Sequence, residues 1–521
     1  MVFVVLTAVH TWPIAAAPAH WARIDNGDGA LNVWAVNWVG THLFRDPARI
    51  AEANIFFPER HSLAFSEMLL VQGAFAAPAI ALGAPPVLAF NVAVFTGFAF
   101  TGWAFCLLTW RWTGSWAAGY VCGSLAAFNA HTLVRIAHVQ TLHLEFFALA
   151  LFALDGLIAS RRFRDACWLG VWFALHAMTS IYLLVFAVWT LAFAALARIR
   201  EISRAGSAAM ALRFGAAALV ATGLLYPYLS VYLDLRAQGL SRGAGEVVAA
   251  TWQDYLATGA RLHVAWSRGF FSNAASFSFP GFVAMVLAAV ALGSRLSRGD
   301  ARVRMCAVAA IGGIAVSMAG RASFYPALHD VIPMLQAVRV QAHLGQLVLV
   351  MIAVLAGFGT AAIGRRWGSE RRWPAAAAVL VIAVNIEALR APIGFTWFER
   401  VPTVYDALIA ERHAVVVELP FPIPSQWFLN GPYMVNSTRH WRPLLNGYSG
   451  FRPASYDRSY DAARDFPRAE SLIKLHDLGV THIIVHRLAL GEDRVAAIGK
   501  AQSLQEIASD GDIAIYRFRA P

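Results

Sequence analysis

The sequence predicts an α-helical polytopic membrane protein of about eleven transmembrane helices, followed by a small C-terminal α/β domain outside the membrane. Of its 521 residues, 58% are apolar and only 14% are charged, whereas an ordinary soluble domain carries roughly a quarter charged residues. Apolar runs of about 20 residues, the length that crosses a ~30 Å hydrocarbon core, recur as far as residue 391. Beyond Pro392 the chain becomes polar and contains strand-like runs.

The basic residues indicate membrane topology. The formal net charge of +11 would by itself fit a nucleic-acid-binding protein. The arginines, however, gather in short clusters between apolar runs, as the charges of cytoplasmic loops do. We therefore expect no nucleic-acid partner. The four clusters lie within 161–164, 198–204, 295–304 and 365–372.

The apolar runs supply eleven spans. If all four clusters are cytoplasmic, the chain between adjacent clusters must cross the membrane an even number of times, and each pair complies. The run 167–197 is too long for one span and is divided near Thr179 and Ser180. The run 63–83 contains Glu67, which is costly in a lipid-facing span, so we predict that this helix does not cross. The predicted spans are 2–19, 86–109, 114–130, 140–160, 167–197 (two spans), 208–231, 280–294, 305–320, 346–364 and 374–391.

This topology places residues 20–85 outside as the first external loop of a membrane domain that covers residues 1–391. Residues 392–521 are then also external, because the last span leads outward from the last arginine cluster. Strand-like runs and two helical patterns between them predict a small α/β fold there. The strands are expected at 414–422, 481–487 and 513–518, and the helices near 402–411 and 466–478.

Two aspartates in RIDNGDGALNVW open the first external loop. Asp25 and Asp28 can serve as a general base, as a pair of metal ligands or as a helix cap, since Asp is a preferred N-cap. Gly27 and Gly29 let the backbone approach a ligand closely. The next run, LNVWAVNWVGTHLF, has near-helical apolar spacing and fits an amphipathic helix at the bilayer surface. That helix is compatible with a capping Asp28 and with a catalytic one.

A second polar cluster lies in NAHTLVRIAHVQTLHLE, residues 129–145, between two predicted spans. Its candidate binding residues are Arg135, His138 and Glu145. Arginine suits phosphate recognition because its planar fork donates two parallel hydrogen bonds, and histidine transfers protons near neutral pH. A hydrogen-bonded network that joins short helices explains the same residues equally well.

Two later external loops and one loop of the C-terminal domain add candidates. Arg242, Arg321 and Arg339 lie outside, against the positive-inside bias, which favours an anionic ligand such as a lipid-linked phosphate; loop structure or headgroup contact is the alternative. The loop 438–456, rich in aromatic residues, arginine and glycine, can stack on a sugar or peptide, or dock the domain onto the membrane region.

Several familiar motifs are missing from the sequence. There is no Walker A motif, no GxGxxG after a strand, no HExxH and no GxSxG in a strand-turn-helix setting. The four cysteines lie in apolar segments without metal-ligand or disulfide-framework spacing. Because the sequence has no nucleotide-binding motif, the energy for any reaction must come from the substrate.

The order of these elements resembles the GT-C superfamily of integral-membrane glycosyltransferases, which use polyprenyl-phosphate-linked sugars. Asp28 matches the acidic residue that opens a juxtamembrane helix in the first external loop, and the non-spanning run 63–83 and the polar loop 129–145 follow in the family's order. NIFFPERHSLAFSE, FNAHTLVRIAHVQTLHLEFFALAL and HWRPLLNGYSGF are similar to a bacterial subfamily. The chain departs from the family in two places. Gly29 stands where the family often has a second acid, and the polar loop 129–145 lacks the Asp that many members have there.

The resemblance implies transfer of a sugar from a polyprenyl-phosphate donor to a glycan, lipid or protein acceptor at the outer face of a bacterial inner membrane. Asp28, supported or replaced by Asp25, would be the general base. His138 and Glu145 would substitute for the acid of the second loop. A divalent cation is compatible with this scheme. The phosphate would contact Arg135, Arg242, Arg321 and Arg339.

Two other functions fit the same elements. One is a transporter or flippase of lipid-linked glycans, although paired halves with interrupted helices, common in transporters, are not found in the sequence. The other is a non-catalytic membrane assembly protein with the same fold.

Overall fold

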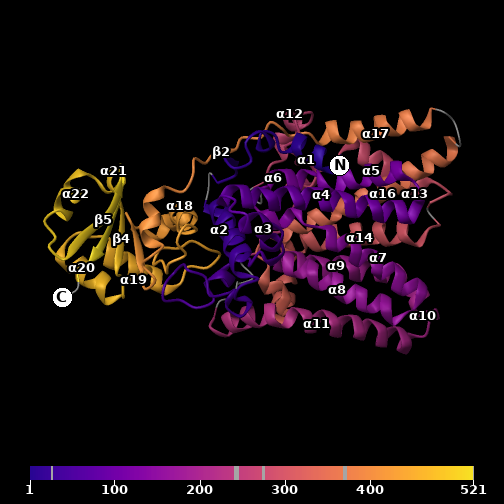
Figure 1. Ribbon diagram of the computed structural model, residues 1–521. Helices are drawn as coiled ribbons and strands as arrows, with labels where there is room; N and C mark the ends of the chain where they lie inside the picture. The colour runs from indigo at the N-terminus through magenta and orange to yellow at the C-terminus, as the bar shows by residue number, and fades with distance from the viewer. Residues whose placement is uncertain (25–26, 240–245, 273–275, 298, 368–371, 520–521) are drawn as a thin grey trace. The chain divides into compact units, whose positions relative to one another are not determined.

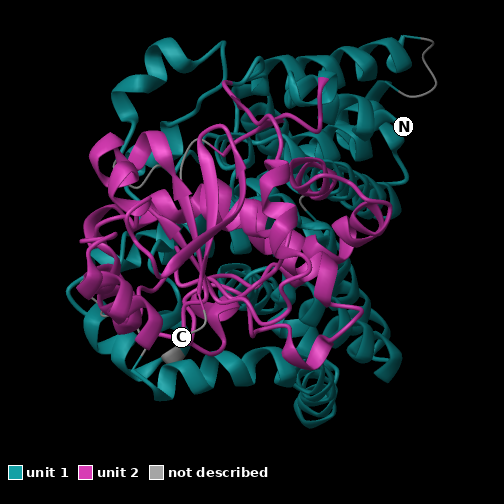
Figure 2. Cartoon of the chain, turned by 60° about the vertical axis from the view of Figure 1, so that its left-hand side comes forward, with its two compact units in different colours: residues 1–16, 94–393 teal, residues 17–93, 394–521 magenta. Residues whose placement is uncertain are grey.

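The computed structural model describes residues 1–521 except 25–26, 240–245, 273–275, 298, 368–371 and 520–521. The chain forms two compact units, each assembled from separate stretches of sequence. Unit 1 contains residues 1–16 and 94–393, and unit 2 contains residues 17–93 and 394–521 (Figure 2). The whole of the predicted first external loop, residues 20–85, thus groups with residues 394–521.

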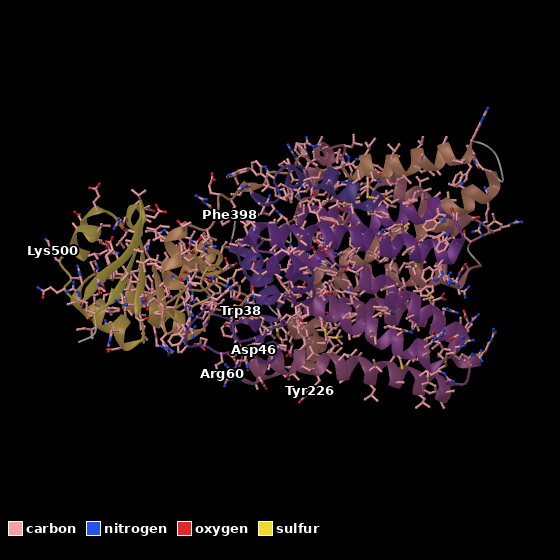
Figure 3. The ribbon with its side chains drawn as sticks, viewed as in Figure 1. Trp38, Asp46, Arg60, Tyr226, Phe398 and Lys500 are labelled. Carbon is pink, nitrogen blue, oxygen red and sulfur yellow. The ribbon has the colours of Figure 1, made fainter. Side chains whose placement is uncertain are left out.

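Unit 1 is built from apolar helices, many of which run alongside one another (Figure 1). The most enclosed long helix is α16 (Gly345–Trp367), whose apolar window is 83% buried. By contrast, the window of α11 (Ser207–Ala237) is only 22% buried, and Tyr226 on this helix is exposed (Figure 3). The other helices are α1 (Val2–His10), α4 (Pro86–Thr113, which begins in unit 2), α5 (Trp116–Ala127), α6 (Ala130–Val134), α7 (Glu145–Ser160), α8 (Phe163–Thr179), α9 (Ile181–Leu196), α10 (Ile199–Arg204), α12 (Val264–Ser267), α13 (Phe282–Gly293), α14 (Ala301–Met318), α15 (Tyr325–Val331) and α17 (Trp373–Ala388).

Four helical stretches in the described part of the chain are long and apolar enough to cross a membrane: Pro86–Thr113, Ser207–Ala237, Ala301–Arg321 and Gln341–Trp367. Shorter apolar helices accompany them, so the total of eleven spans stays a prediction. The predicted break in the run 167–197 is confirmed. Ser180, whose backbone is extended, follows the last residue of α8. Its hydroxyl caps α9 by accepting hydrogen bonds from the backbone N–H groups of Tyr182 and Leu183.

The first helix is shorter than predicted. The apolar run 2–19 suggested a helix across its whole length, but α1 ends at His10. The reason is Pro13, which lacks a backbone donor and disfavours helical geometry at the residue before it. A short 3-10 helix, Ile14–Ala16, follows.

Unit 2 contains a four-stranded sheet of order β3-β4-β6-β5, in which β3 and β4 are parallel and the other pairs antiparallel. Three strands coincide with predicted runs: β3 (Val416–Leu419), β4 (His482–His486) and β6 (Ile513–Phe518). The edge strand β5 (Leu504–Asp510) was not predicted. The remaining elements are β1 (Trp21–Ala22), α2 (Gly27–His42), α3 (Leu70–Ala81), β2 (Thr396–Trp397), α18 (Gly431–Ser437), α19 (Ala454–Ala463), α20 (Ala469–Asp477), α21 (Arg487–Leu490) and α22 (Glu492–Ile498).

Helix α2 is buried on nearly every side, so the expected amphipathic surface helix is wrong. Trp34 is 1% exposed and Trp38 is 6% exposed. Their indole N–H groups donate hydrogen bonds to Asn54 Oδ1 (3.0 Å) and to the carbonyl of Ile50 (2.9 Å), and Figure 3 labels Trp38. These tryptophans are thus packed and hydrogen-bonded inside protein.

Helix α3 packs closely on α2. A Cβ atom at Gly73 would lie 2.3 Å from Val39 Cγ1, so only glycine allows this approach. The 12 residues of α3 span about 18 Å at 1.5 Å per residue, which is less than a ~30 Å hydrocarbon core. The run 63–83 therefore contains a helix too short to cross a bilayer by itself.

Candidate active site

Asp28 lies in the first turn of α2 and is half-buried. The hydroxyl of Tyr448 donates a 2.6 Å hydrogen bond to Asp28 Oδ1. Tyr448 comes from the aromatic loop 438–456, which therefore supplies a direct partner to the candidate base. Asp25 lies outside the described residues.

The backbone around Asp28 leaves no room for a second acid at the next position. A Cβ atom at Gly29 would lie 1.9 Å from the carbonyl oxygen of Arg23. On the other side of Asp28, a Cβ at Gly27 would lie 2.7 Å from Phe428 Cβ and 2.9 Å from Tyr448 Cε1. The two glycines thus let the start of α2 pack closely against neighbouring segments. Asp28 lies between them, at the point of this close packing.

Aromatic side chains surround the Asp28 and Tyr448 pair. The rings of Trp427 and Tyr448 meet edge to face with centroids 4.9 Å apart, and Phe428 next to them is 42% exposed. Aromatic faces pack well against apolar surface while Tyr and Trp retain a polar group. The carboxylate thus lies among aromatic rings, one of which reaches the surface.

A separate polar cluster in unit 1 gathers several predicted binding residues. The rings of His131 and His343 pack edge to face, 5.1 Å apart, although the residues are far apart in sequence. The charges of Arg135, His138 and Arg339 act on the His343 ring. The structure thus brings Arg135, His138 and Arg339 to one place.

His131 is the most deeply placed member of this cluster. Its side chain is fully buried, and neither ring nitrogen has a hydrogen-bond partner among the described residues. Burial, together with the nearby charges of Arg135 and His138, holds the pKa of His131 well below its usual range. Buried polar atoms normally have partners, so a neutral imidazole without one marks a position for a ligand or a water.

The other predicted binding residues are placed differently. Glu145 is buried, and its Oε1 lies 2.9 Å from His143 Nδ1 while its Oε2 accepts a hydrogen bond from Thr101. Arg321 is exposed and donates to the carbonyl of Ala250 at 3.2 Å. Arg242 lies outside the described residues. Glu145 and Arg321 are engaged with protein groups, and their binding roles stay predictions.

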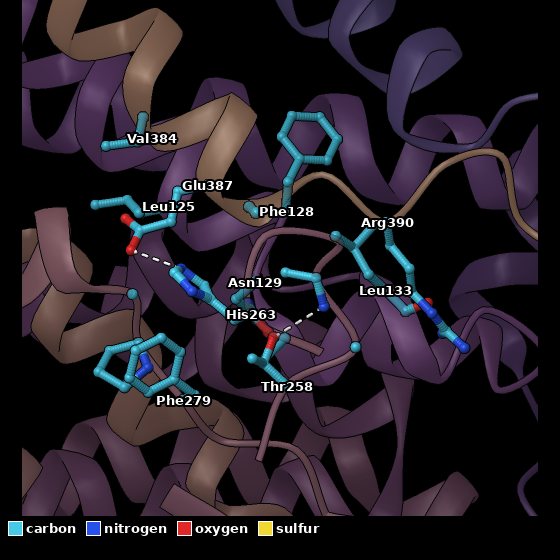
Figure 4. A pocket seen from close by; sticks show the side chains of 16 residues that line it. Leu125, Phe128, Asn129, Leu133, Thr258, His263, Phe279, Val384, Glu387 and Arg390 are labelled. Atoms are coloured by element: carbon cyan, nitrogen blue, oxygen red, sulfur yellow. Dashed lines mark hydrogen bonds and ion pairs between the residues drawn. The ribbon is translucent and has the colours of Figure 1, made fainter. Parts of the chain in front are cut away.

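A further polar site in unit 1 was not predicted from the sequence. A small cavity of about 30 Å³ lies beside Asn129, Thr258, His263 and Glu387 (Figure 4). Glu387, on α17, accepts hydrogen bonds from the first two backbone amides of α13 and lies 3.1 Å from His263 Nε2. It therefore caps a neighbouring helix. Its signal in the sequence was an acid inside the apolar run 374–391, which is costly unless paired.

The described residues that could serve as metal ligands do not include Asp25. Among the described residues there is no group of three or more His, Cys, Asp or Glu side chains that could hold a metal ion.

Comparison with known proteins supports the fold. No protein-family model and no curated protein matches the sequence. Arabinofuranosyltransferase AftD from Mycobacteria is similar in structure, with a TM-score of 0.57 and 14% identity over 100% of this chain and 39% of that one. The chain thus spans well under half the length of AftD.

Two further solved structures match with lower scores. They are oligosaccharyltransferase AglB from Archaeoglobus fulgidus (TM-score 0.47, 12% identity, 99% of this chain and 73% of that one) and ArnT from Cupriavidus metallidurans (0.45, 13%, 99% and 97%). The comparison rests on AftD, which has the highest of these three TM-scores, and it shows that the chain has the GT-C fold.

Proposed function

We propose that this protein is a membrane glycosyltransferase that moves a sugar from a polyprenyl-phosphate-linked donor to an acceptor hydroxyl. The observation that carries the proposal is the carboxylate of Asp28, held by the Tyr448 hydroxyl at the start of α2. The GT-C fold supports it, and so does the sequence resemblance, which matches Asp28 with the acid that opens a helix in the family's first external loop. The expected acceptor is a glycan, lipid or protein, at the outer face of a bacterial inner membrane.

Asp28 acts as the general base in this scheme. It takes the proton of the acceptor hydroxyl as that oxygen attacks the anomeric carbon of the donor sugar. The bond between the anomeric carbon and the phosphate oxygen breaks, and the electron pair leaves with the polyprenyl phosphate. The Tyr448 hydroxyl donates a hydrogen bond to Oδ1 of the same carboxylate and so holds the side chain of the base in place.

A second proposal concerns the polar cluster of unit 1 and does not depend on where Asp28 lies. The charges of Arg135, His138 and Arg339 act on the buried His343 ring, and we propose that the two arginines bind the phosphate of a lipid-linked ligand. Arginine is suited to this role by the geometry of its paired donors.

An Asp28→Asn variant tests the proposal. It keeps the size of the side chain but cannot accept the proton, so we expect transfer to fall by at least the ~100-fold typical of a lost general base. Purified protein in lipid vesicles would be given synthetic polyprenyl-phosphate donors that carry a single labelled hexose or pentose, and released polyprenyl phosphate would be measured. Asp46→Asn is the matched control, because Asp46 is exposed beyond the far end of α2.

The outcome separates the three functions. Loss of transfer in Asp28→Asn, with normal expression and with activity retained in Asp46→Asn, supports the enzyme. If wild-type vesicles move a lipid-linked glycan across the bilayer without releasing polyprenyl phosphate, and Asp28→Asn does the same, the protein is a transporter. A wild-type protein that does neither with any donor in the panel would contradict catalysis and favour an assembly role.

A further inference from the structure

A long apolar groove in unit 1 runs between α9 and α11. Helix α8 packs against both helices and forms its floor, with Gly170 close to the backbone of Ala217. The groove has a volume of about 750 Å³, and Thr222 is the one polar side chain among the described residues that line it. Ala218 and Thr222 are themselves exposed, so the groove opens on the surface of the helices.

The groove has the length of a lipid chain. Its lining residues on α11 extend from Phe214 to Leu229, which is about 22 Å at 1.5 Å per residue. One leaflet of a ~30 Å hydrocarbon core is ~15 Å deep. An acyl chain that lies along α11 would therefore fit within the groove over its full depth in the leaflet.

One end of the groove is basic. The short helix α10 closes this end with Ile199 and Ile202, and it exposes Arg200 and Arg204. The acid of the same helix, Glu201, is already paired with Arg198 and Arg304, at 2.5 and 3.3 Å. Within the described part of the chain, neither Arg200 nor Arg204 forms a salt bridge, so this end carries net positive charge.

We propose that the groove binds one acyl chain of an anionic phospholipid, whose phosphate lies at Arg200 and Arg204. The basic connections of the chain are expected on the cytoplasmic side, where anionic headgroups attract arginine and lysine. A donor lipid that reacts at the outer face would carry its phosphate at the opposite end of these helices. The site is thus distinct from the proposed donor site, and it does not depend on glycosyl transfer.

Native mass spectrometry of the purified full-length protein in detergent tests this site. The protein would be titrated with phosphatidylglycerol, phosphatidylethanolamine and undecaprenyl phosphate. We expect phosphatidylglycerol to bind more tightly than phosphatidylethanolamine. An Arg200→Gln, Arg204→Gln double variant should weaken its binding about 30-fold, which corresponds to ~1 kcal/mol for each arginine. The control is Arg365→Gln with Arg366→Gln, two exposed arginines at the end of α16, which should change little.

A second pair of variants tests the apolar part of the site. Ala218→Trp fills the groove from its exposed side, so it should reduce phosphatidylglycerol binding at least tenfold without preventing folding. Leu219→Trp places the same side chain on the next residue, which is 75% exposed and does not line the groove, and it should bind normally. Equal binding of the two phospholipids, or no effect of the arginine pair, would overturn the proposal. So would loss of undecaprenyl phosphate binding alone in Ala218→Trp, since the groove would then hold the donor lipid.

Discussion

A buried charge pair in the C-terminal sheet predicts how the stability of unit 2 changes with pH. Glu418 on β3 is fully buried, and His486 at the end of β4 lies 2.6 Å from its Oε1. The hydroxyl of Tyr405 donates to the same oxygen, and the His486 ring stacks on Tyr433 with centroids 5.0 Å apart. The pair therefore joins the two parallel strands β3 and β4 from inside.

The pKa of His486 fixes the direction of the effect. Burial opposes its charge, but the hydrogen bond and the charge of Glu418, with Asp512 nearby, outweigh burial and raise the pKa above the usual value. A histidine whose pKa is raised by folding stabilises the folded state fully below ~6.5, and that contribution is lost as the pH rises through the raised value. Unit 2 should therefore weaken as the pH rises from about 6.5.

Three other histidines of unit 2 act in the opposite direction and lie outside this window. Burial lowers the pKa of His440 to about 3 and also lowers those of His42 and His482. A folded state that keeps these rings neutral loses stability as the pH falls below ~6.5. The change above that pH is therefore assigned to His486.

The Glu418→Gln variant measures how much the Glu418 and His486 pair stabilises unit 2. Breaking a fully buried ion pair costs about 3–5 kcal/mol; because the His486 side chain is 16% exposed, we expect ~3 kcal/mol, near the lower limit. Hydrogen exchange of the full-length protein in detergent would follow peptides that cover β3 and β4 at pH 6 and pH 9, corrected for the intrinsic rate. At pH 6 the variant should exchange about 150-fold faster than the wild type in these peptides.

Two variants make the experiment decisive. His486→Gln should remove the loss of protection between pH 6 and pH 9 in β4. Glu506→Gln breaks the partly exposed pair with Arg487 at 3.1 Å and should cost no more than ~1 kcal/mol. Equal wild-type protection at both pH values, or an unchanged pH dependence in His486→Gln, would refute the assignment of charge to this pair.

Two further substitutions test contacts described above. Tyr448→Phe removes the hydrogen-bond donor to Asp28. A hydrogen bond to a charged group is worth ~1.5–3 kcal/mol, so kcat/KM for sugar transfer should fall about 10- to 100-fold. Tyr460→Phe on α19 is the control and should not change kcat/KM. An unaltered rate in Tyr448→Phe would remove Tyr448 from the site. Glu387→Ala leaves the first two backbone amides of α13 without their acceptor. It should destabilise the protein by ~2–4 kcal/mol, which would be measured as a lower Tm in detergent. Glu399→Ala, at an exposed position, is the control. Equal Tm values for the two variants would contradict the capping role.

The sequence was sufficient to locate elements that depend on local pattern. Apolar runs located most of the helices from α4 onward, and the polar Thr179 and Ser180 predicted the break between α8 and α9. Asp28 was expected to open a helix, and it lies in the first turn of α2. Each of these features follows from hydrophobic length or from the preference of a residue for a helix end.

Features that depend on distant contacts could not be predicted in this way. The partner of Asp28 is 420 residues away, and the contact between His131 and His343 also joins remote segments. Helix α2 has tryptophans at a spacing that fits an interface, yet they are buried, and Asn54 and Ile50 accept their hydrogen bonds. The edge strand β5 escaped detection because its sequence, LQEIASD, lacks a sustained apolar alternation and most of its side chains are not buried.

The packing of α2 explains why the residue after Asp28 is a glycine. The GT-C pattern often places a second acid after the first, and here that position is Gly29, where the carbonyl oxygen of Arg23 would lie 1.9 Å from any Cβ. A carboxylate at position 29 would thus displace the backbone that positions Asp28. A second acid at position 29 is therefore excluded by the close approach of Arg23, and among the described residues the Tyr448 hydroxyl, at 2.6 Å, is a hydrogen-bond partner of the Asp28 carboxylate.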